Sequence, residues 1–311
     1  MTAQRKVLIT GCAGFIGSNL ADRLCRKGVE VIGVDNLAYG LASQIPPGVV
    51  FHKLDIRDPA IFPLFQDVDV TFHLAAKNCI TDCQNDPVET ASINVAGTVN
   101  VFEAALKAGT RKVVYAESSA IYEGSTRLPT PETDEAPQSF YALSKQAAHL
   151  FALGYARFHA IKLTGLRYFC VYGPRQDYRR TIPPVMSAFI IKLLRGESPT
   201  IYGSGDKRRD FIHVDDINDF HELCITSAAT DGQVFNLGSG LNYSVRDIYE
   251  HVSALLNIRL PASFCADLPG EAQVTLADIS RAQRVGWSPK IGLDDGLRTM
   301  IEFIQKNATE S

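Results

Sequence analysis

The first half of the chain alternates short apolar runs with longer amphipathic segments, and this pattern restricts the fold more than any other feature. The short runs are rich in Val and Ile and almost continuously apolar, as expected for strands buried on both faces of a parallel sheet. Their alternation with helices indicates right-handed βαβ units and an α/β, Rossmann-like doubly wound parallel sheet. The predicted strands are residues 6–10, 30–34, 49–54, 70–74, 112–117, 161–167 and 234–237, and the predicted helices are residues 15–27, 59–65, 87–108, 141–159 and 185–195.

The composition excludes several classes of protein. The chain has 311 residues and a formal net charge of -3, so no global positive field is available to attract nucleic acid or an anionic membrane. No apolar run reaches the roughly 18 residues that indicate a membrane span, and residues 1–12 read as a first strand, not as a signal peptide. The seven cysteines are scattered and form no CxxC pair, so we expect reduced thiols in a cytoplasmic protein, without a metal site or a disulfide framework.

A glycine-rich turn follows the first predicted strand and opens the first predicted helix. It contains Gly11, Gly14 and Gly17, with Phe15 and Ile16 as the first helical residues. Glycines at this spacing permit a tight turn and a close approach of the backbone to a diphosphate, which the helix N-terminus binds through its N–H groups and dipole. A turn without a ligand is the alternative, but the strand–turn–helix context favours a dinucleotide site.

Asp35 ends the second predicted strand, 18 residues after Gly17. A carboxylate there accepts hydrogen bonds from the adenosine ribose hydroxyls and repels the 2′-phosphate of NADP, so the sequence favours NAD as the cofactor. A strand-end cap is the weaker alternative, whereas Asp58 is expected only to cap the helix that begins at Pro59. Further cofactor contacts are expected near the ends of neighbouring strands: Asn36, Asp55, Ile56, Ala75, Ala76 and Lys77.

A catalytic group is indicated where the fifth predicted strand ends. Ser118 and Ser119 lie there, and Tyr141 begins a helix that carries Lys145 one turn later on the same face. A free tyrosine has a pKa of about 10, and a nearby ammonium together with the positive nicotinamide ring would favour its phenolate. The serine hydroxyl could orient the substrate hydroxyl. A lone Tyr-x-x-x-Lys pair often arises by chance, but with Ser118 behind a dinucleotide fingerprint it indicates an oxidoreductase.

These motifs, together with HLAA, LRYFCVYGPRQ, IYGSGDKRRDFIHVDD and NLGSG, resemble those of the extended NAD-dependent epimerase/dehydratase family, in the same order along essentially the whole chain. The resemblance implies an NAD-binding Rossmann domain over residues 1–172, with later returns near 210–240, and a smaller C-terminal α/β domain over residues 173–311 that binds a UDP-sugar. It also implies that Tyr141 and Lys145 are catalytic partners, and that the chain forms a homodimer through the helices at 87–108 and 141–159.

The resemblance also assigns contacts to the ligands. Tyr168 matches a residue near the nicotinamide, and Arg209 matches the arginine that binds the substrate diphosphate, for which the guanidinium has a suitable bidentate geometry. Thr200 and Tyr202 belong to the segment that corresponds to the uracil pocket. The remaining positions expected to contact the substrate are Ser119, Cys170 and Gln273.

Four positions depart from the family pattern. Glu123 follows Tyr122 where glycine is usual, and Cys170 occupies a position that is usually asparagine. Cys79 lies in a loop that usually holds small or apolar residues, and Gln273 occupies the position of a phosphate-binding arginine. The Asp-Glu pair of the familiar 4,6-dehydratases is Ser119-Ala120 here, so 4,6-dehydration by those groups is not expected.

These departures suggest a second chemical step after oxidation of the sugar at C4. A C4 ketone acidifies the C5–H, and Cys79 and Glu123 would act as base and acid, in either order, for loss of the C6 hydroxyl as water. The pattern looks similar to a branch of the family, the UDP-N-acetylglucosamine 5,6-dehydratases of tunicamycin-type antibiotic pathways. The alternatives are a 4-epimerase for UDP-hexoses or UDP-N-acetylhexosamines and a non-catalytic NAD-sensing regulator. Equally open are a packing role for Cys79 and a solvated loop position for Glu123.

Overall fold

The protein is described by a computed structural model that covers residues 5–178, 183–267 and 272–308 and divides into two compact units. Unit 1 comprises Met1–Ser125, Glu132–Tyr168 and Asn218–Asn236, and unit 2 comprises Thr126–Pro131, Phe169–Ile217 and Leu237–Ser311. The first four residues of the predicted first-strand segment, part of the arginine-rich loop after residue 173 and residues 269–271 before Gln273 lie outside the described residues.

Unit 1 is built on a seven-stranded sheet in the order β11-β6-β5-β4-β1-β2-β3, and its pairs from β6 to β3 are parallel. The strand order reverses between β1 and β4, and ligands of doubly wound sheets bind outside the carboxyl ends of the strands at such a switch point. The predicted Rossmann-like α/β class is confirmed. The strands are β1 (Lys6–Thr10), β2 (Glu30–Asp35), β3 (Val49–Lys53), β4 (Val70–His73), β5 (Lys112–Ser118), β6 (Lys162–Tyr168) and β11 (Val234–Leu237).

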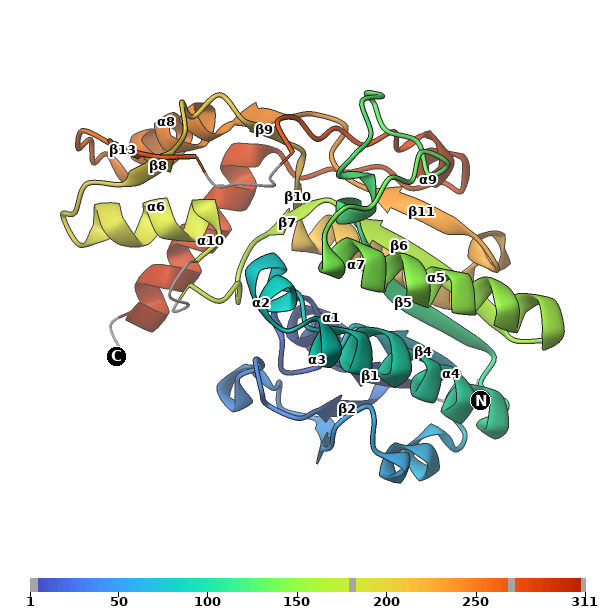
Figure 1. Ribbon diagram of the computed structural model, residues 1–311. Helices are drawn as coiled ribbons and strands as arrows, with labels where there is room; N and C mark the ends of the chain where they lie inside the picture. The colour runs from blue at the N-terminus through green and yellow to red at the C-terminus, as the bar shows by residue number, and fades with distance from the viewer. Residues whose placement is uncertain (1–4, 179–182, 268–271, 309–311) are drawn as a thin grey trace. The chain divides into compact units, whose positions relative to one another are not determined.

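The helices of unit 1 bury apolar faces against this sheet. Helices α3, α4 and α5 pack together on one side, where α4 contacts β4 and α5 contacts β5 and β6 (Figure 1). Helix α1 packs on β1 and β2, and its Arg23 pairs with Asp219 and Glu222 of α7. The bounds are α1 (Phe15–Arg26), α2 (Ile80–Asn85), α3 (Pro87–Ala91), α4 (Thr98–Ala108), α5 (Phe140–Phe158) and α7 (Val214–Thr226), with the short 3-10 helices η1 (Ala42–Gln44), η4 (Ser119–Tyr122) and η5 (Ala228–Thr230).

Two predicted helices differ in form from the expectation. The segment expected as one helix over residues 87–108 contains a π-helical stretch, η3 (Ser92–Gly97), between α3 and α4. Gly97 is the last residue of this stretch and packs closely against the core. A Cβ at this position would lie 2.7 Å from Cδ1 of Ile56. The segment expected at residues 59–65 is a 3-10 helix, η2 (Pro59–Phe65), since Pro63 inside it lacks an N–H for α-helical bonding. Asp58 caps η2 as predicted, by accepting a hydrogen bond from the Ala60 amide.

Unit 2 contains helices around a separate apolar core. Met186 and Phe189 of α6 pack there with Ile248 of α8 and Leu297 of α10. None of the helices in the described ranges is long and apolar enough to cross a membrane. The helices are α6 (Val185–Leu194), α8 (Val245–Leu256), α9 (Ser280–Arg284) and α10 (Leu293–Ala308), and the paired strands are β7 (Cys170–Tyr172) with β10 (Phe211–His213), β8 (Thr200–Tyr202) with β13 (Ser263–Cys265), and β9 (Arg208–Arg209) with β12 (Tyr243–Ser244).

Candidate active site

The glycine-rich turn forms a tight cradle between β1 and α1. Gly11 has a φ of +74°, and a Cβ on it would lie 2.7 Å from the Ala75 amide nitrogen. A Cβ on Gly17 would lie 2.1 Å from the Gly11 carbonyl oxygen, so neither position accepts a side chain without movement of the backbone. Gly14 is the N-cap of α1 and provides no side-chain cap. The amides of Phe15 and Ile16 at the start of α1 are therefore available to an anionic ligand.

Asp35 lies beside this cradle at the end of β2. Its side chain is buried, and its carboxylate accepts hydrogen bonds from the amides of Ala13 (3.0 Å) and Leu37 (2.8 Å). Burial raises the pKa of Asp35, although these two amides counteract the effect. Each carboxylate oxygen has a further lone pair, so Asp35 can bind ribose hydroxyls while it ties the glycine turn to β2.

Asn36 and Asp55 form a polar rim next to Asp35. The Asn36 amide donates to Asp55 at 3.0 Å, and the Arg57 guanidinium donates to both Asp55 oxygens at 2.8 Å. Hydrogen bonds from Arg57 hold the pKa of Asp55 well below its usual value, so this carboxylate is ionised. The neighbouring Ile56 side chain is buried in the core of unit 1, which leaves its backbone as the part that can contact an adenine ring.

The end of β4 brings three further predicted cofactor residues toward the glycine turn. Ala75 is held by its amide, which donates to the Thr10 hydroxyl at 3.3 Å, and Ala76 follows it in the same segment. The Lys77 amide donates to Asn94 of η3 at 2.8 Å. The Lys77 side chain is buried, with its ammonium 3.5 Å from the Asp86 carbonyl oxygen. Lys77 is thus fixed to the segments after β4 by both its backbone and its side chain.

Ser118, Tyr141 and Lys145 come together in unit 1, as the sequence predicted. Ser118 ends β5, and its side chain hydrogen-bonds the Tyr141 phenol. The Lys145 ammonium lies 6.0 Å from the centre of the Tyr141 ring and donates to the Ala116 carbonyl oxygen at 2.9 Å. Ser139 caps the N-terminus of α5 through the Ala142 amide and so fixes the turn that carries Tyr141. Ser119 begins η4 directly after Ser118.

The ionisation of this cluster differs from the expectation. Burial raises the pKa of Tyr141 to about 12, and the hydrogen bond with Ser118 offsets only part of this rise. Burial also lowers the pKa of Lys145 to about 8, against the opposing charge of Glu117. The side chains alone favour the neutral phenol of Tyr141. The predicted phenolate therefore depends on the positive charge of a bound cofactor.

Glu123, one of the two residues expected to perform an elimination, is engaged at the N-terminus of α5. Its carboxylate accepts hydrogen bonds from the Ser139 amide (2.7 Å), the Ser139 hydroxyl (2.9 Å) and the Gln138 amide (3.2 Å). The same carboxylate is close enough to disfavour ionisation of Tyr141. Glu123 therefore lies beside the catalytic cluster and anchors the helix that carries Tyr141.

Cys79, the second residue expected in an elimination, is the N-cap of α2 and is partly exposed. Cys83 lies one helical turn further and is fully buried, and only as a thiolate would it act on the charges of Tyr141 and Lys145. The sequence reasoning missed Cys83, although its i+4 spacing from Cys79 within the same helix was a usable signal. Burial raises the pKa of the Cys83 thiol, so it is neutral at pH 7.

Tyr168, expected near the nicotinamide, points its hydroxyl into the interior of unit 1. The hydroxyl lies 2.7 Å from Nε2 of His221, and both side chains are buried.

A larger polar group, which was not predicted from the sequence, is formed by residues of β5, β6, α5 and the loop before α5. We call it the ionic network. Its members are Glu117, Glu135, His149 and Arg167.

The residues expected to bind the substrate nucleotide lie in unit 2. Cys170 pairs with Phe211 in the β7–β10 ladder, and Thr200 and Tyr202 are at the ends of β8. Arg209 follows Arg208 in β9, and its guanidinium lies 3.5 Å from the Gln273 carbonyl oxygen. The side chains of Thr200 and Tyr202 point to one face of β8, whereas Ile201 between them points to the other.

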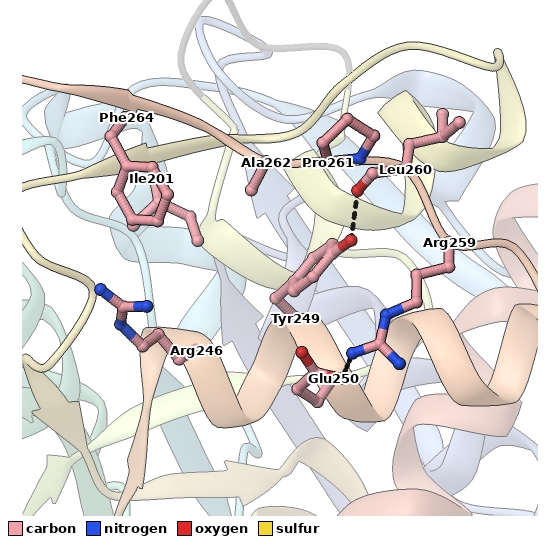
Figure 2. Close-up of a pocket in the computed structure, with 9 residues that line it drawn as sticks. All are labelled: Ile201, Arg246, Tyr249, Glu250, Arg259, Leu260, Pro261, Ala262 and Phe264. Atoms are coloured by element: carbon pink, nitrogen blue, oxygen red, sulfur yellow. Dashed lines mark hydrogen bonds and ion pairs between the residues drawn. The ribbon is translucent and has the colours of Figure 1, made fainter.

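A cavity of about 490 Å³ in unit 2 was also not anticipated from the sequence (Figure 2). The Arg246 guanidinium stacks 5.2 Å from the centre of the Phe264 ring and donates to the Ser204 carbonyl oxygen at 2.7 Å. The Arg259 guanidinium is paired with Glu250. Both arginines of the cavity are therefore engaged by the protein. Its lining consists of Ile201, Arg246, Tyr249, Glu250, Arg259, Leu260, Pro261, Ala262 and Phe264.

The fold agrees with what is found in known proteins. Residues 7–238 match the NAD dependent epimerase/dehydratase family, and the chain belongs to that family. It is 34% identical over 305 residues to a putative UDP-glucose 4-epimerase of Methanocaldococcus jannaschii, with 97% of this chain and 99% of the relative covered.

Two solved structures extend the comparison to ligands. A UDP-glucose 4-epimerase of Thermotoga maritima with UDP-glucose has a TM-score of 0.94 at 30% identity, covering 97% of this chain and 99% of that one. A UDP-glucose 4-epimerase of Thermus thermophilus in complex with NAD has a TM-score of 0.89 at 30% identity, covering 96% and 99%. The chain is an NAD-dependent enzyme of a family that acts on UDP-sugars, and the cradle formed by Gly11, Gly14 and Gly17 fits the diphosphate of NAD.

Proposed function

We propose that this chain is a UDP-sugar 4-epimerase. The observation that carries the proposal is the assembly of Ser118, Tyr141 and Lys145 in the unit that also holds the cofactor cradle. This group is sufficient for reversible oxidation of a sugar hydroxyl, which is the only chemistry that 4-epimerisation requires. Two curated relatives support the same choice, since one is described as a putative UDP-glucose 4-epimerase and the other as a UDP-glucose 4-epimerase.

The three side chains divide the proton chemistry between them. Tyr141 accepts the proton of the C4 hydroxyl, and the Ser118 hydroxyl orients the C4 hydroxyl by a hydrogen bond. Lys145 stabilises the phenolate by its positive charge at a distance of 6.0 Å from the ring centre. Bound NAD supplies a reversible hydride acceptor and a positively charged ring. A planar carbonyl at C4 can receive hydride on either face. If the sugar rotates before hydride returns to C4 and Tyr141 returns the proton to the oxygen, the product is the C4 epimer.

We further propose that two parts of the chain bind the two ligands. Residues 1–172, with the returns near 210–240, would bind NAD, and residues 173–311 would bind the nucleotide. Arg209 would bind the diphosphate through its fork of N–H donors, since guanidinium geometry suits phosphate oxygens. The substrate contacts proposed beside it are Ser119, Cys170, Thr200, Tyr202 and Gln273, and Tyr168 is proposed to support the nicotinamide site from the interior.

Elimination across C5 and C6 is the second candidate, and the closeness of Glu123 to Tyr141 is the observation in its favour. Its three hydrogen bonds to Gln138 and Ser139 would have to break or rearrange before it could transfer a proton in the site. Cys79 would be the second group of the pair. The 5,6-dehydratase of tunicamycin-type pathways, acting on UDP-N-acetylglucosamine, therefore stays a prediction that ranks below epimerisation.

A homodimer is proposed from the exposed apolar side chains of α5. Leu143, Leu150 and Phe158 recur at intervals of seven and eight residues and are 43%, 60% and 75% exposed. A helix with such a stripe is expected to bury it against another helix, and a second copy of α5 offers the same surface. The seven free cysteines suit a reducing compartment, and we propose the cytoplasm.

Proton NMR in heavy water separates the two candidate reactions. The protein is incubated with NAD and either UDP-glucose or UDP-N-acetylglucosamine, and Tyr141→Phe serves as the matched control. A C4 epimer without an alkene signal supports the proposal, whereas a vinylic signal would replace it with 5,6-elimination. Absence of both products from wild-type protein with bound NAD would contradict both candidates for these sugars.

A further inference from the structure

A buried carboxylate lies directly behind the catalytic serine. Glu117 precedes Ser118 in β5, and its side chain is fully buried. One oxygen accepts a hydrogen bond from Nε of Arg167 at 2.7 Å, and the other lies 3.0 Å from Nδ1 of His149. Burial alone would raise the pKa of Glu117, but the neighbouring His149 and Arg167 outweigh this effect and lower it. Glu117 is therefore a buried negative charge at neutral pH.

The neighbouring strand makes room for this carboxylate. Gly165 in β6 faces it, and a Cβ at that position would lie 2.4 Å from Oε1 of Glu117 and 2.8 Å from the Tyr115 hydroxyl oxygen. Tyr115 and Glu117 are two residues apart in β5 and share the face covered by α5, where the Tyr115 hydroxyl lies 3.0 Å from Nδ1 of His149. The absence of a side chain at Gly165 thus accommodates the polar ends of two neighbouring side chains.

Lys145 shares one face of α5 with His149, the residue that lies beside Glu117. Tyr141, Lys145 and His149 are spaced by four residues, so they follow one another along the helix. His149 reaches Glu117, and the Lys145 ammonium donates to the carbonyl oxygen of Ala116, the residue before Glu117. Glu117 thus directly follows the residue that binds the Lys145 ammonium, and its charge favours that ammonium.

The charged and titratable groups around Lys145 come from four elements. Glu117 from β5 favours its ammonium, and Cys83 from α2 would do so only as a thiolate. Tyr141 precedes Lys145 on α5, and His73 of β4 is uncharged, because burial and then the charge of Lys145 lower its pKa to about 3. Around Glu117 itself are Tyr115, His149 and Arg167, with Glu135 beyond Arg167.

We propose that Glu117 is a positioning residue of the active site, whose fixed negative charge keeps Lys145 protonated and thereby enables Tyr141 to accept the substrate proton. The proposal rests on the function proposed above, since it assumes that Tyr141 is the proton acceptor. Glu117 acts through Lys145, because its own carboxylate is held by Arg167 and lies beside His149. A structural role alone would stabilise the fold without changing the titration of Lys145.

The test compares Glu117→Gln with Glu135→Gln, which removes the second carboxylate partner of Arg167 and is not among the groups that act on Lys145. Turnover of the epimerised sugar is measured against pH in each NAD-loaded variant. Separately, the 13Cε signal of Lys145 is titrated in protein labelled at lysine, with Lys145→Arg to assign it. Glu117→Gln is expected to lower both the basic limb of turnover and the Lys145 midpoint by about one pH unit, and Glu135→Gln to leave both within a few tenths of a unit.

An unchanged Lys145 midpoint in folded Glu117→Gln would overturn the proposal, and so would an equal shift in Glu135→Gln. If Glu117→Gln does not fold, the double variant Glu117→Gln/Arg167→Gln removes both charges of the pair, and its Lys145 midpoint must still fall. The lysine titration needs no sugar substrate. Failure of the proposed epimerase function would appear as absent turnover in the wild type, whereas failure of this inference would appear in the titration.

Discussion

The two polar regions of unit 1, the catalytic cluster of Ser118, Tyr141 and Lys145 and the ionic network, hold their polar groups in different ways. In the cluster, Tyr141 is hydrogen-bonded by Ser118, and Lys145 donates to a single carbonyl oxygen at 2.9 Å. In the network, the single guanidinium of Arg167 donates hydrogen bonds to four groups: Glu117, Glu135, the Tyr122 hydroxyl and the Glu132 carbonyl oxygen. The cluster keeps groups whose protonation can change, whereas the network fixes the opposite charges of Glu117 and Arg167.

Burial changes the pKa of a group in the two regions differently, and the difference follows from the partners that each group has. It raises the pKa of Tyr141 to about 12, because only the hydrogen bond with Ser118 works against it. It does not raise the pKa of Glu117, because a guanidinium and an imidazole compensate for the lost water. A buried group thus keeps its charge only where the protein supplies the partners, and the cluster depends on a cofactor for one of them.

The largest expected effect separates two tyrosines: Tyr141 of the catalytic cluster, and Tyr122, whose hydroxyl is bound by Arg167 of the ionic network. Tyr141→Phe removes the proton acceptor and is expected to lower turnover by about 10³-fold or more, while the melting temperature and NAD binding are retained. Tyr122→Phe removes a hydroxyl that donates to Asn236 at 2.6 Å and accepts from Arg167, so it is expected to cost about 1–3 kcal/mol of stability with turnover kept within a few-fold. Steady-state kinetics and urea unfolding of both variants measure the contrast.

The comparison between the regions would fail if the two substitutions had the same profile. Loss of stability in Tyr141→Phe equal to that in Tyr122→Phe would mean that the cluster is also mainly structural. Turnover in Tyr141→Phe within a few-fold of the wild type would remove the assigned role of that phenol as the proton acceptor.

The scaffold and the closeness of Ser118, Tyr141 and Lys145 were predictable from the sequence because both depend on local pattern. Apolar runs located the strands of unit 1 to within one residue at each end, and the spacing of Tyr141 and Lys145 on one helix face is a local property. The π-helical stretch Ser92–Gly97 was not predictable from the helical pattern of residues 87–108, and the close packing of Gly97 against Ile56, 41 residues earlier in the chain, is not a local feature of the sequence. Pro63 was a local signal for the 3-10 form of η2 that the helical pattern obscured.

The ionic network could not be found in the sequence because its partners are distant along the chain. Glu117 reads as a single polar residue at the end of an apolar strand, and its partner Arg167 is 50 residues away on the next strand of the sheet. Glu123 attracted attention because it departs from a familiar motif, yet its observed hydrogen bonds cap α5. Departure from a motif identified a residue near the site and did not identify its contacts.

A second prediction tests whether the network carries stability through fixed charge. Arg167→Met leaves Glu117 buried without its guanidinium and is expected to lower the free energy of unfolding by about 3–5 kcal/mol. The matched control is Lys27→Met, which removes an exposed cation paired with Glu222 and is expected to cost less than about 1 kcal/mol. Urea unfolding monitored by circular dichroism measures both. Equal costs for the two substitutions would show that burial of the ion pair is not what distinguishes the network.

The smallest expected effect is the pH dependence that His149 gives to stability. Burial alone would lower the pKa of His149, but the hydrogen bond and charge of Glu117 outweigh it and raise the value in the folded protein. A raised folded-state pKa contributes stability that is fully present below the unfolded value of about 6.5 and is lost as the pH rises through the folded value.

The difference in unfolding free energy between the wild type and His149→Gln is therefore expected to grow on acidification from about pH 9 to pH 6, and urea titrations at several pH values measure it. Because Glu117 stays ionised over this range, the change reports protonation of the imidazole beside a fixed carboxylate. A difference that is constant with pH would mean that His149 remains neutral in the network and that Glu117 draws its compensation from Arg167 alone.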